Sequence, residues 1–300
     1  MNEPETVVVP SAVATVAADV LSERKQARRE NWRLIRRRPA FIIGVLIVLL
    51  WTACALFGKQ IAPHDAFDFR AGTHISPTGK FPFGTDEQGR DVLSRVIVGA
   101  RDVLKVAPLA AVLGVLFGVI LGMIMGYFGG WLDNVLGRIV EAFLALPVLL
   151  LALLGVATFG KSSAVVIAIV AVLFTPIVAR TVRSAVLAER DLDYVTSARL
   201  RGESSAFVMF REIAPNVSAP IIVELTVRIG YAVFTVATLS FVGAGPEPPS
   251  PDWGVQVSDA FRVISAGIWW TTFFPALAIG SLVIAVNLIA DSVQSVLEAS

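Results

Sequence analysis

The sequence is poor in the residues from which catalytic and metal sites are usually built. Its 300 residues include one cysteine and two histidines, and only 16% of them are charged. Because Cys54 is the only cysteine, a disulfide framework and a cysteine-based metal site are excluded. The formal net charge of +1 gives no indication of nucleic-acid binding. Little in this composition favours chemistry carried out by the chain itself.

Sequence motifs for phosphate binding and hydrolysis are missing as well. The sequence has no G-x-x-x-x-G-K-[ST] loop, so we do not expect the chain to bind ATP through a P-loop. It has no H-E-x-x-H and no G-x-S-x-G, and we assign no catalytic and no metal-ligating residues. His64 and His74 share one segment without a ligand spacing. Solvated side chains are the simpler interpretation, and a nickel site is the alternative.

Apolar residues, in contrast, make up 55% of the sequence and are gathered into long runs. Each run is near or above the roughly 17 residues that a helix needs to cross a bilayer. Backbone groups in lipid must be paired within their own segment, so the runs are expected to be helical. The sequence therefore predicts an all-α integral membrane protein with six transmembrane helices. The six runs are Phe41–Phe57, Val103–Phe128, Val135–Phe159, Ala164–Val182, Ala219–Val242 and Ile268–Ile289.

Charge places the two ends of the chain. A cluster of basic residues between Arg24 and Arg38 stands just ahead of the first run, which favours a cytoplasmic N-terminus. Six spans then return the C-terminus to the cytoplasm. The predicted segments are a cytoplasmic basic segment 1–40, a first transmembrane helix 41–58, an extracytoplasmic loop 59–102, a core 103–292 with a polar loop 191–216, and a cytoplasmic tail 293–300.

The polar loop 191–216 separates two apolar runs and reads as two short helices around a glycine. Asp193 is expected to cap the first helix, and Gly202 to end it in a left-handed turn. Ser204 or Ser205 caps the second, and Pro215 stops it. Phe207 and Phe210 fall on one side of the second helix. Helices this short cannot span a bilayer, so the pair must lie on the membrane surface or in a groove of another protein.

The second apolar run has a glycine at every fourth position, which leaves one helix face without side chains. A neighbouring helix backbone can approach such a face closely, so these residues predict tight helix packing. The residues are Gly114, Gly118, Gly122 and Gly126.

Few charges lie inside the apolar runs. Glu224 is followed four residues later by Arg228, a spacing that predicts an ion pair. We interpret this pair and Glu141 as structural, because a proton relay would need a chain of such groups near mid-membrane. Tryptophans near the other end of the fifth and sixth runs are expected at the outer membrane interface, where indole is favoured. They are Trp253, Trp269 and Trp270.

Four stretches resemble ABC importer permeases of the dipeptide, oligopeptide and nickel subfamily, in particular the second of their two permease subunits. The signature loop of that family reads Glu-Ala-Ala, three residues, Gly, and further on Ile-x-Pro. The other three stretches are GTDEQGRDVLSRVIVGAR, GYFGGWLDNVLGRIVEAFLALP and LSFVGAGPEPPSPDWG. The glutamate and one alanine of the signature are absent, and Val236 stands where the subfamily often has an acidic residue. The residues at the signature positions are, in order, Thr196, Ser197, Ala198, Gly202, Ile213, Ala214 and Pro215.

The resemblance implies the type I ABC importer permease (MetI-like) fold with a cytoplasmic coupling helix. In that family the coupling helix docks in a groove on a cytoplasmic ATPase, and ATP-driven closure of two ATPases rocks two permeases between inward- and outward-open forms. The implied partners are a second homologous permease, two ATPase subunits that carry ATP and Mg²⁺, an extracytoplasmic solute-binding lipoprotein and the lipid of a bacterial inner membrane. No cofactor is implied in this chain. The residues implied to couple to the ATPase are Thr196, Ser197, Ala198, Gly202, Phe207, Phe210, Ile213 and Pro215.

Import of short peptides is the function that the resemblance implies, with nickel or haem as other substrates of the subfamily. An ion-coupled secondary transporter would call for internal repeats, broken mid-membrane helices and buried ionisable groups, which are not evident in the sequence. A membrane enzyme is a third alternative. It would be favoured if mutation of Glu141 abolished a chemical activity and left transport intact. ATP dependence of uptake separates the first two.

Overall fold

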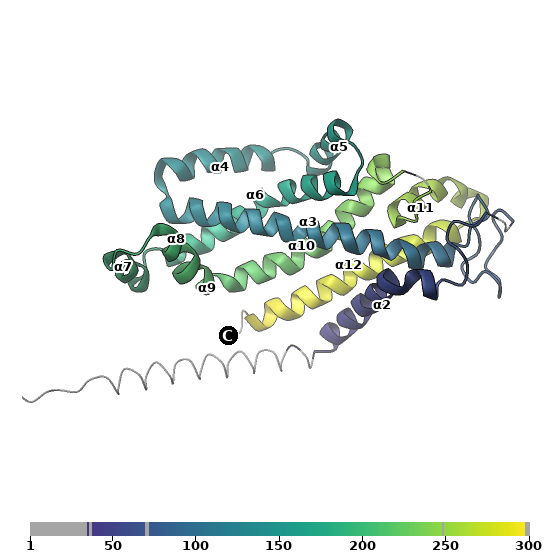
Figure 1. Cartoon of the computed structure of the whole chain (residues 1–300), viewed down its shortest axis with the longest axis horizontal. Helices are drawn as coiled ribbons and strands as arrows, with labels where there is room; N and C mark the ends of the chain where they lie inside the picture. Colours follow the sequence, from purple (N-terminus) through teal and green to yellow (C-terminus); the bar gives the residue numbers. More distant parts are fainter. Residues whose placement is uncertain (1–34, 36–37, 70–71, 248, 298–300) are drawn as a thin grey trace, which may run out of the picture.

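The computed structural model of the protein describes residues 35, 38–69, 72–247 and 249–297 (Figure 1). Most of the basic N-terminal cluster, and the end of the predicted tail, lie outside the described residues. The described residues form helices and one isolated β-bridge between Thr85 and Asp91. The all-α prediction is therefore confirmed. The α-helices are α2 (Pro39–Ile61), α3 (Val92–Phe128), α4 (Gly130–Leu144), α5 (Val148–Phe159), α6 (Ser163–Glu189), α7 (Asp193–Leu200), α8 (Ser205–Phe207), α9 (Ala214–Asn216), α10 (Ser218–Leu239), α11 (Trp253–Ala260) and α12 (Trp270–Leu297).

Among the described residues, five helical segments are long and apolar enough to cross a membrane: α2, α3, α6, α10 with its π-helical extension η2 (Ser240–Ala244), and α12. The pair α4 and α5 makes a sixth span if it is counted as one, and its two helices are bent by 89°. The chain is thus a multi-span membrane protein.

The third predicted run, Val135–Phe159, is not one straight helix but the bent pair of α4 and α5. Pro147 stands at the break, with Leu146 before it in a bend. A proline disfavours helical backbone in the residue that precedes it, which ends α4. The proline is visible in the sequence, but the apolar run continues on both sides of it, so hydropathy alone does not reveal the break.

The second span starts earlier than its apolar run. It was predicted to begin at Val103. Instead α3 runs unbroken from Val92, capped by the Asp91 side chain, which accepts a hydrogen bond from the Ser94 backbone N–H at 3.2 Å. Its first turns carry charged residues that hydropathy scores as loop, so the predicted extracytoplasmic loop 59–102 is shorter than expected.

The glycine stripe of α3 lies against α6. A Cβ atom at Gly118 would stand 2.5 Å from the Val178 Cβ, and one at Gly126 would stand 2.7 Å from the Val186 Cβ. Both distances are far below an ordinary carbon–carbon contact, so only glycine lets the two backbones come this close. The result is one closely packed pair of long helices at the centre of the protein.

The two ends of the helix bundle differ (Figure 1). At one end lie α7 to α9 and the C-terminal end of α12, and at the other lie residues 62–69 and 72–91 and α11. The second end is tied together by indoles. Trp253 is fully buried and its Nε1 donates to the Val96 carbonyl at 2.8 Å, while the Trp270 Nε1 donates to the Thr85 carbonyl at 3.2 Å.

These contacts correct the expected place of the tryptophans. Of the three, Trp253 and Trp270 pack inside the protein, and Trp269 is 49% exposed. Trp253 is also the first residue of α11, a helix that the sequence reading missed. The Asp252 side chain caps α11 by accepting a hydrogen bond from the Val255 backbone N–H at 3.0 Å.

Candidate functional site

The polar loop folds into a helical hairpin, which we call the 191–217 hairpin. Its first helix is α7 and its second consists of α8, the π-helix η1 (Val208–Ile213) and α9. Gly202 joins the two with a φ of +78°, which confirms the predicted left-handed turn. The Gly202 backbone N–H donates to the Arg199 carbonyl, and the Glu203 backbone N–H donates to the Ala198 carbonyl. This pair of bonds is the Schellman arrangement that satisfies the end of a helix.

Local rules placed the second cap correctly and the first incorrectly. The Ser204 hydroxyl accepts a hydrogen bond from the Phe207 backbone N–H at 3.2 Å, as predicted. Asp193 is not a cap: it is the first residue of α7, and the preceding residue, Leu192, makes no side-chain cap bond. An acidic residue there still favours the helix electrostatically, because the first turn carries the positive end of the helix dipole.

Pro215 does not stop the second helix, contrary to expectation. It lies inside α9, and the chain leaves helical geometry only at Val217. The π-helix η1 comes immediately before it. Its wider turn makes room for the proline ring, which would otherwise press on the carbonyl four residues earlier.

One face of the hairpin is buried against the ends of α3 and α6. Val195, Ala198, Val208 and Ile213 are all fully buried. They share an apolar cluster with α3 and α6 residues that includes Met123, Val182 and Val186. The hairpin is therefore a packed extension of the α3–α6 pair.

Polar contacts also join the hairpin and the end of α6 to each other and to the end of α3. The Arg190 Nη1 donates to the Gly126 carbonyl at 3.1 Å, and the Arg199 guanidinium lies over the Tyr127 ring, 4.8 Å from its centroid. The Tyr194 hydroxyl donates to the Glu189 carboxylate at 2.7 Å. Burial, and then this bond, raise the pKa of Tyr194 to about 12, so the hydroxyl remains a donor at neutral pH. Sequence reasoning missed these links, for which its only signal was the basic cluster around the loop.

The exposed side of the hairpin carries three large apolar side chains among polar ones. Leu200 is 84% exposed, Phe207 37% and Phe210 48%. Apolar side chains of this size, projecting from short helices, are typical of a helix that docks in a groove. Of the sequence-predicted coupling residues, the structure exposes Thr196, Ser197, Gly202, Phe207, Phe210 and Pro215 and buries Ala198 and Ile213.

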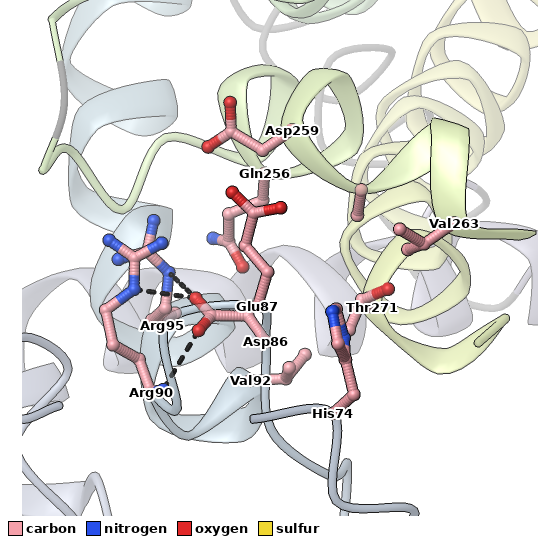
Figure 2. A pocket seen from close by; sticks show the side chains of 11 residues that line it. His74, Asp86, Glu87, Arg90, Val92, Arg95, Gln256, Asp259, Val263 and Thr271 are labelled. Carbon is pink, nitrogen blue, oxygen red and sulfur yellow. Dashed lines mark hydrogen bonds and ion pairs between the residues drawn. The ribbon is translucent and has the colours of Figure 1, made fainter. Parts of the chain in front are cut away.

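A second cluster of polar side chains lies at the other end of the bundle (Figure 2). The Arg90 Nε donates to the Asp86 carboxylate at 2.6 Å, and the Arg95 Nη2 donates to the Ser250 carbonyl at 2.7 Å. Asp259 of α11 lines the same pocket, and burial raises the pKa of its carboxyl group. The pocket measures about 20 Å³. That is room for roughly one water molecule, so this cluster holds the end of the bundle together and is too small for a peptide.

The two histidines line different pockets. The His64 Nδ1 lies 3.1 Å from the Asp91 carboxylate, and His74 lines the pocket of Figure 2. Within the described part of the chain, no group of three or more histidine, cysteine, aspartate or glutamate residues is arranged to hold a metal ion.

The ion pair predicted inside the fifth span is confirmed. The Arg228 Nε donates to one Glu224 carboxylate oxygen at 2.9 Å, and the Thr181 hydroxyl donates to the other at 2.8 Å. Both charged side chains are 13% exposed. A carboxylate with both oxygens engaged in this way links α6 to α10.

Comparison with known proteins identifies the family. Residues 27–77 match the N-terminal transmembrane domain of oligopeptide transport permease C. Residues 118–300 match the family described as binding-protein-dependent transport system inner membrane component. The chain belongs to this family. It is an inner-membrane permease subunit, which agrees with its multi-span structure.

Individual relatives of the permease are similar over almost their whole length. The dipeptide transport system permease protein DppC of Escherichia coli (strain K12) is 41% identical over 280 residues, 90% of this chain and 92% of the relative. The di/tripeptide transport system permease protein DppC of Pseudomonas aeruginosa (strain UCBPP-PA14) is 35% identical over 90% of this chain and 91% of its own. The glutathione transport system permease protein GsiD of Shigella flexneri serotype 5b (strain 8401) is 40% identical over 90% of this chain and 89% of its own.

The turn at Gly202 gives a first test of the hairpin. Gly202→Val should destabilise the permease by about 1–2 kcal/mol, because a residue with a Cβ resists left-handed backbone. No atom lies within 4 Å of the position of an added Cβ, so the cost is conformational and not steric. Thermal unfolding of the purified permease measures it. Gly202→Asn is the matched control and should cost less, because asparagine tolerates this conformation. Equal melting temperatures for both variants and wild type would contradict the assignment.

Proposed function

We propose that the chain is the transmembrane permease subunit of an ATP-driven ABC importer that moves short peptides into the cell. The observation that carries this proposal is the 41% identity to a dipeptide transport permease over 90% of the chain. The di/tripeptide and glutathione permeases are similar over the same share of the chain. Dipeptides and oligopeptides are therefore the proposed substrates, with nickel and haem as less supported alternatives.

In this proposal the 191–217 hairpin is the coupling element that docks on an ATPase subunit. Its exposed apolar side chains, Leu200, Phe207 and Phe210, enter a groove on the ATPase. Ala198 and Ile213 act from within the permease, because both are fully buried there and hold the hairpin on α3 and α6. ATP and Mg²⁺ bind the ATPase subunits, and this chain hydrolyses nothing.

Movement of the hairpin is passed to the spans through the α3–α6 pair. Arg199 of the hairpin contacts the end of α3, as does Arg190 at the end of α6, and the buried cluster attaches the hairpin to both helices. Because the glycine stripe packs α3 and α6 closely, a pull on the hairpin moves both helices together. Such rigid-body movement is what alternating access requires of one half of a transporter.

The proposed orientation puts the hairpin and both termini in the cytoplasm. Basic residues gather at the hairpin end, as expected for cytoplasmic segments. Residues 62–91 and α11 then face the extracytoplasmic side, where a solute-binding lipoprotein would deliver substrate. A second, homologous permease completes the pathway. The basic residues are Arg180, Arg183, Arg190, Arg199, Arg201 and Arg211.

Reconstitution tests this function. The permease, its partner permease, the ATPase subunits and the binding lipoprotein are placed in proteoliposomes, and uptake of labelled dialanine is measured with and without ATP. We expect uptake only with ATP and all components. Uptake driven by an ion gradient without ATP would contradict the proposal and favour a secondary transporter. Uptake of Ni²⁺ but of no peptide would move the assignment to the nickel alternative.

A further inference from the structure

A groove of about 390 Å³ opens between α4 and α6 at the hairpin end of the bundle. Its volume lies at the lower end of the range of small-molecule sites, roughly 300–1,000 Å³. We call it the α4–α6 groove. Its charged lining residues are Asp133, Arg138 and Glu141 from α4, and Arg180 and Arg183 from α6.

Two of these charges are paired with each other. The Arg183 Nε and Nη2 donate to the two Asp133 carboxylate oxygens at 2.5 Å and 2.6 Å. Two parallel bonds of this kind fix the relative position of the two side chains, and with them α4 on α6. The pair therefore forms a rigid wall of the groove. The other three charged side chains take no part in it.

The remaining three charges have no such partner. Among the described residues, the side chains of Arg138, Arg180 and Glu141 make neither a hydrogen bond nor an ion pair, and all three residues are exposed. The groove thus presents two free cations and one free anion around a neutralised pair.

These free charges lie toward the hairpin end of α4 and α6, which limits what they can face. Charged side chains near the end of a span face water or a polar partner, because exposure to hydrocarbon is costly. The opposite side of α4 is apolar and exposed, with Trp131, Val135 and Ile139 at four-residue spacing. With 3.6 residues per turn, these three lie on one side of α4 and Asp133, Gly137 and Glu141 on the other, while Arg138 stands at the border beside Trp131. The apolar side of α4 meets lipid or protein, whereas the groove side carries the charges.

We propose that the α4–α6 groove binds the two charged termini of the transported peptide, with Arg138 and Arg180 holding its carboxylate and Glu141 its ammonium group. This inference rests on the proposed function of peptide import. The charge pattern favours a zwitterion over a phosphate, because Glu141 repels a dianion and attracts an ammonium group. A groove of this size accommodates a dipeptide and leaves the side chains free to vary, which suits a transporter of many short peptides.

The experiment measures direct binding by the complete transporter without its lipoprotein. Both permeases and the ATPase subunits are placed in nanodiscs, and binding of labelled dialanine, dialanine amide and N-acetyl-dialanine is measured by equilibrium dialysis. Wild type should bind dialanine at least tenfold more tightly than either blocked peptide. Arg138→Gln with Arg180→Gln should remove the preference over the amide and keep the preference over the acetylated peptide. Glu141→Gln should do the reverse.

Matched variants separate a binding role from a structural one. Lys161→Gln removes one positive charge at an exposed position outside the groove and should leave both preferences unchanged. Arg180→Lys keeps the cation and should keep both preferences within threefold. Because Glu141→Gln tests the other terminus, it decides the question even if the arginine variants fail to assemble.

The proposal is overturned if the groove variants keep both wild-type preferences. It is also overturned if they only release the second permease or bound anionic lipid while the peptide preferences stay unchanged, because the charges then serve an interface or a lipid. If wild type imports dialanine with ATP but binds all three peptides equally here, the groove proposal fails and the import function stands. If wild type imports no peptide at all, the proposed function itself fails.

Discussion

Replacing Phe210 with aspartate should reduce ATP-driven uptake at least tenfold and leave the permease folded. Phe210 is 48% exposed on the hairpin face that carries Leu200 and Phe207, so its ring contributes little to the fold of this chain. In a docked groove, an aromatic anchor of this kind typically contributes 2 kcal/mol or more to binding. A buried aspartate there would also lose its hydration without gaining a partner. The measurement is ATPase copurification with the permease, followed by uptake in proteoliposomes.

The control for this prediction is Phe69→Asp. Phe69 is 56% exposed and belongs to the segment at the opposite end of the bundle, so it makes the same chemical change away from the hairpin. We expect Phe69→Asp to copurify the ATPase subunits at the wild-type level. If Phe210→Asp also does so and transports normally, the hairpin face is not the docking surface.

The fold was largely predictable because membrane helices depend on length and hydropathy, which are local properties. The errors occur where tertiary contacts overrule local composition. The first turns of α3 contain Arg95, which reads as loop, yet Arg95 is buried and its guanidinium donates to the Ser250 carbonyl. The α4–α5 break has a visible cause in Pro147, but no local signal gives its 89° angle.

The hairpin shows the same limit at the level of single residues. Gly202 and Ser204 were placed correctly because turns and caps obey short-range backbone rules. Ala198 and Ile213 belong to the signature pattern, but whether they face a partner or their own chain depends on how the hairpin packs on α3 and α6. The Asp133–Arg183 pair joins residues 50 positions apart, which one sequence does not reveal.

Gly122→Ala should destabilise the permease, although the same change usually stabilises a helix. A Cβ on Gly122 would stand 2.6 Å from the Ala179 carbonyl oxygen and 2.8 Å from the Val182 Cβ. Because one of these atoms is backbone, the α3–α6 pair must separate to admit the methyl group. Overpacking of this kind costs about 1–3 kcal/mol. Thermal unfolding of the purified permease measures the effect as a lower melting temperature.

The matched control is Gly280→Ala in α12, where no atom lies within 4 Å of the added Cβ. There the change relieves the entropic cost of glycine in a helix, so the melting temperature should stay level or rise.

Uptake adds a second test, since the proposed mechanism moves α3 and α6 as one body. Gly122→Ala should therefore lower uptake by more than its loss of folded protein explains, while Gly280→Ala should not. Equal melting temperatures for the two variants would show that the stripe does not set the α3–α6 distance. Normal uptake per folded molecule of Gly122→Ala would instead show that transport does not depend on their close packing.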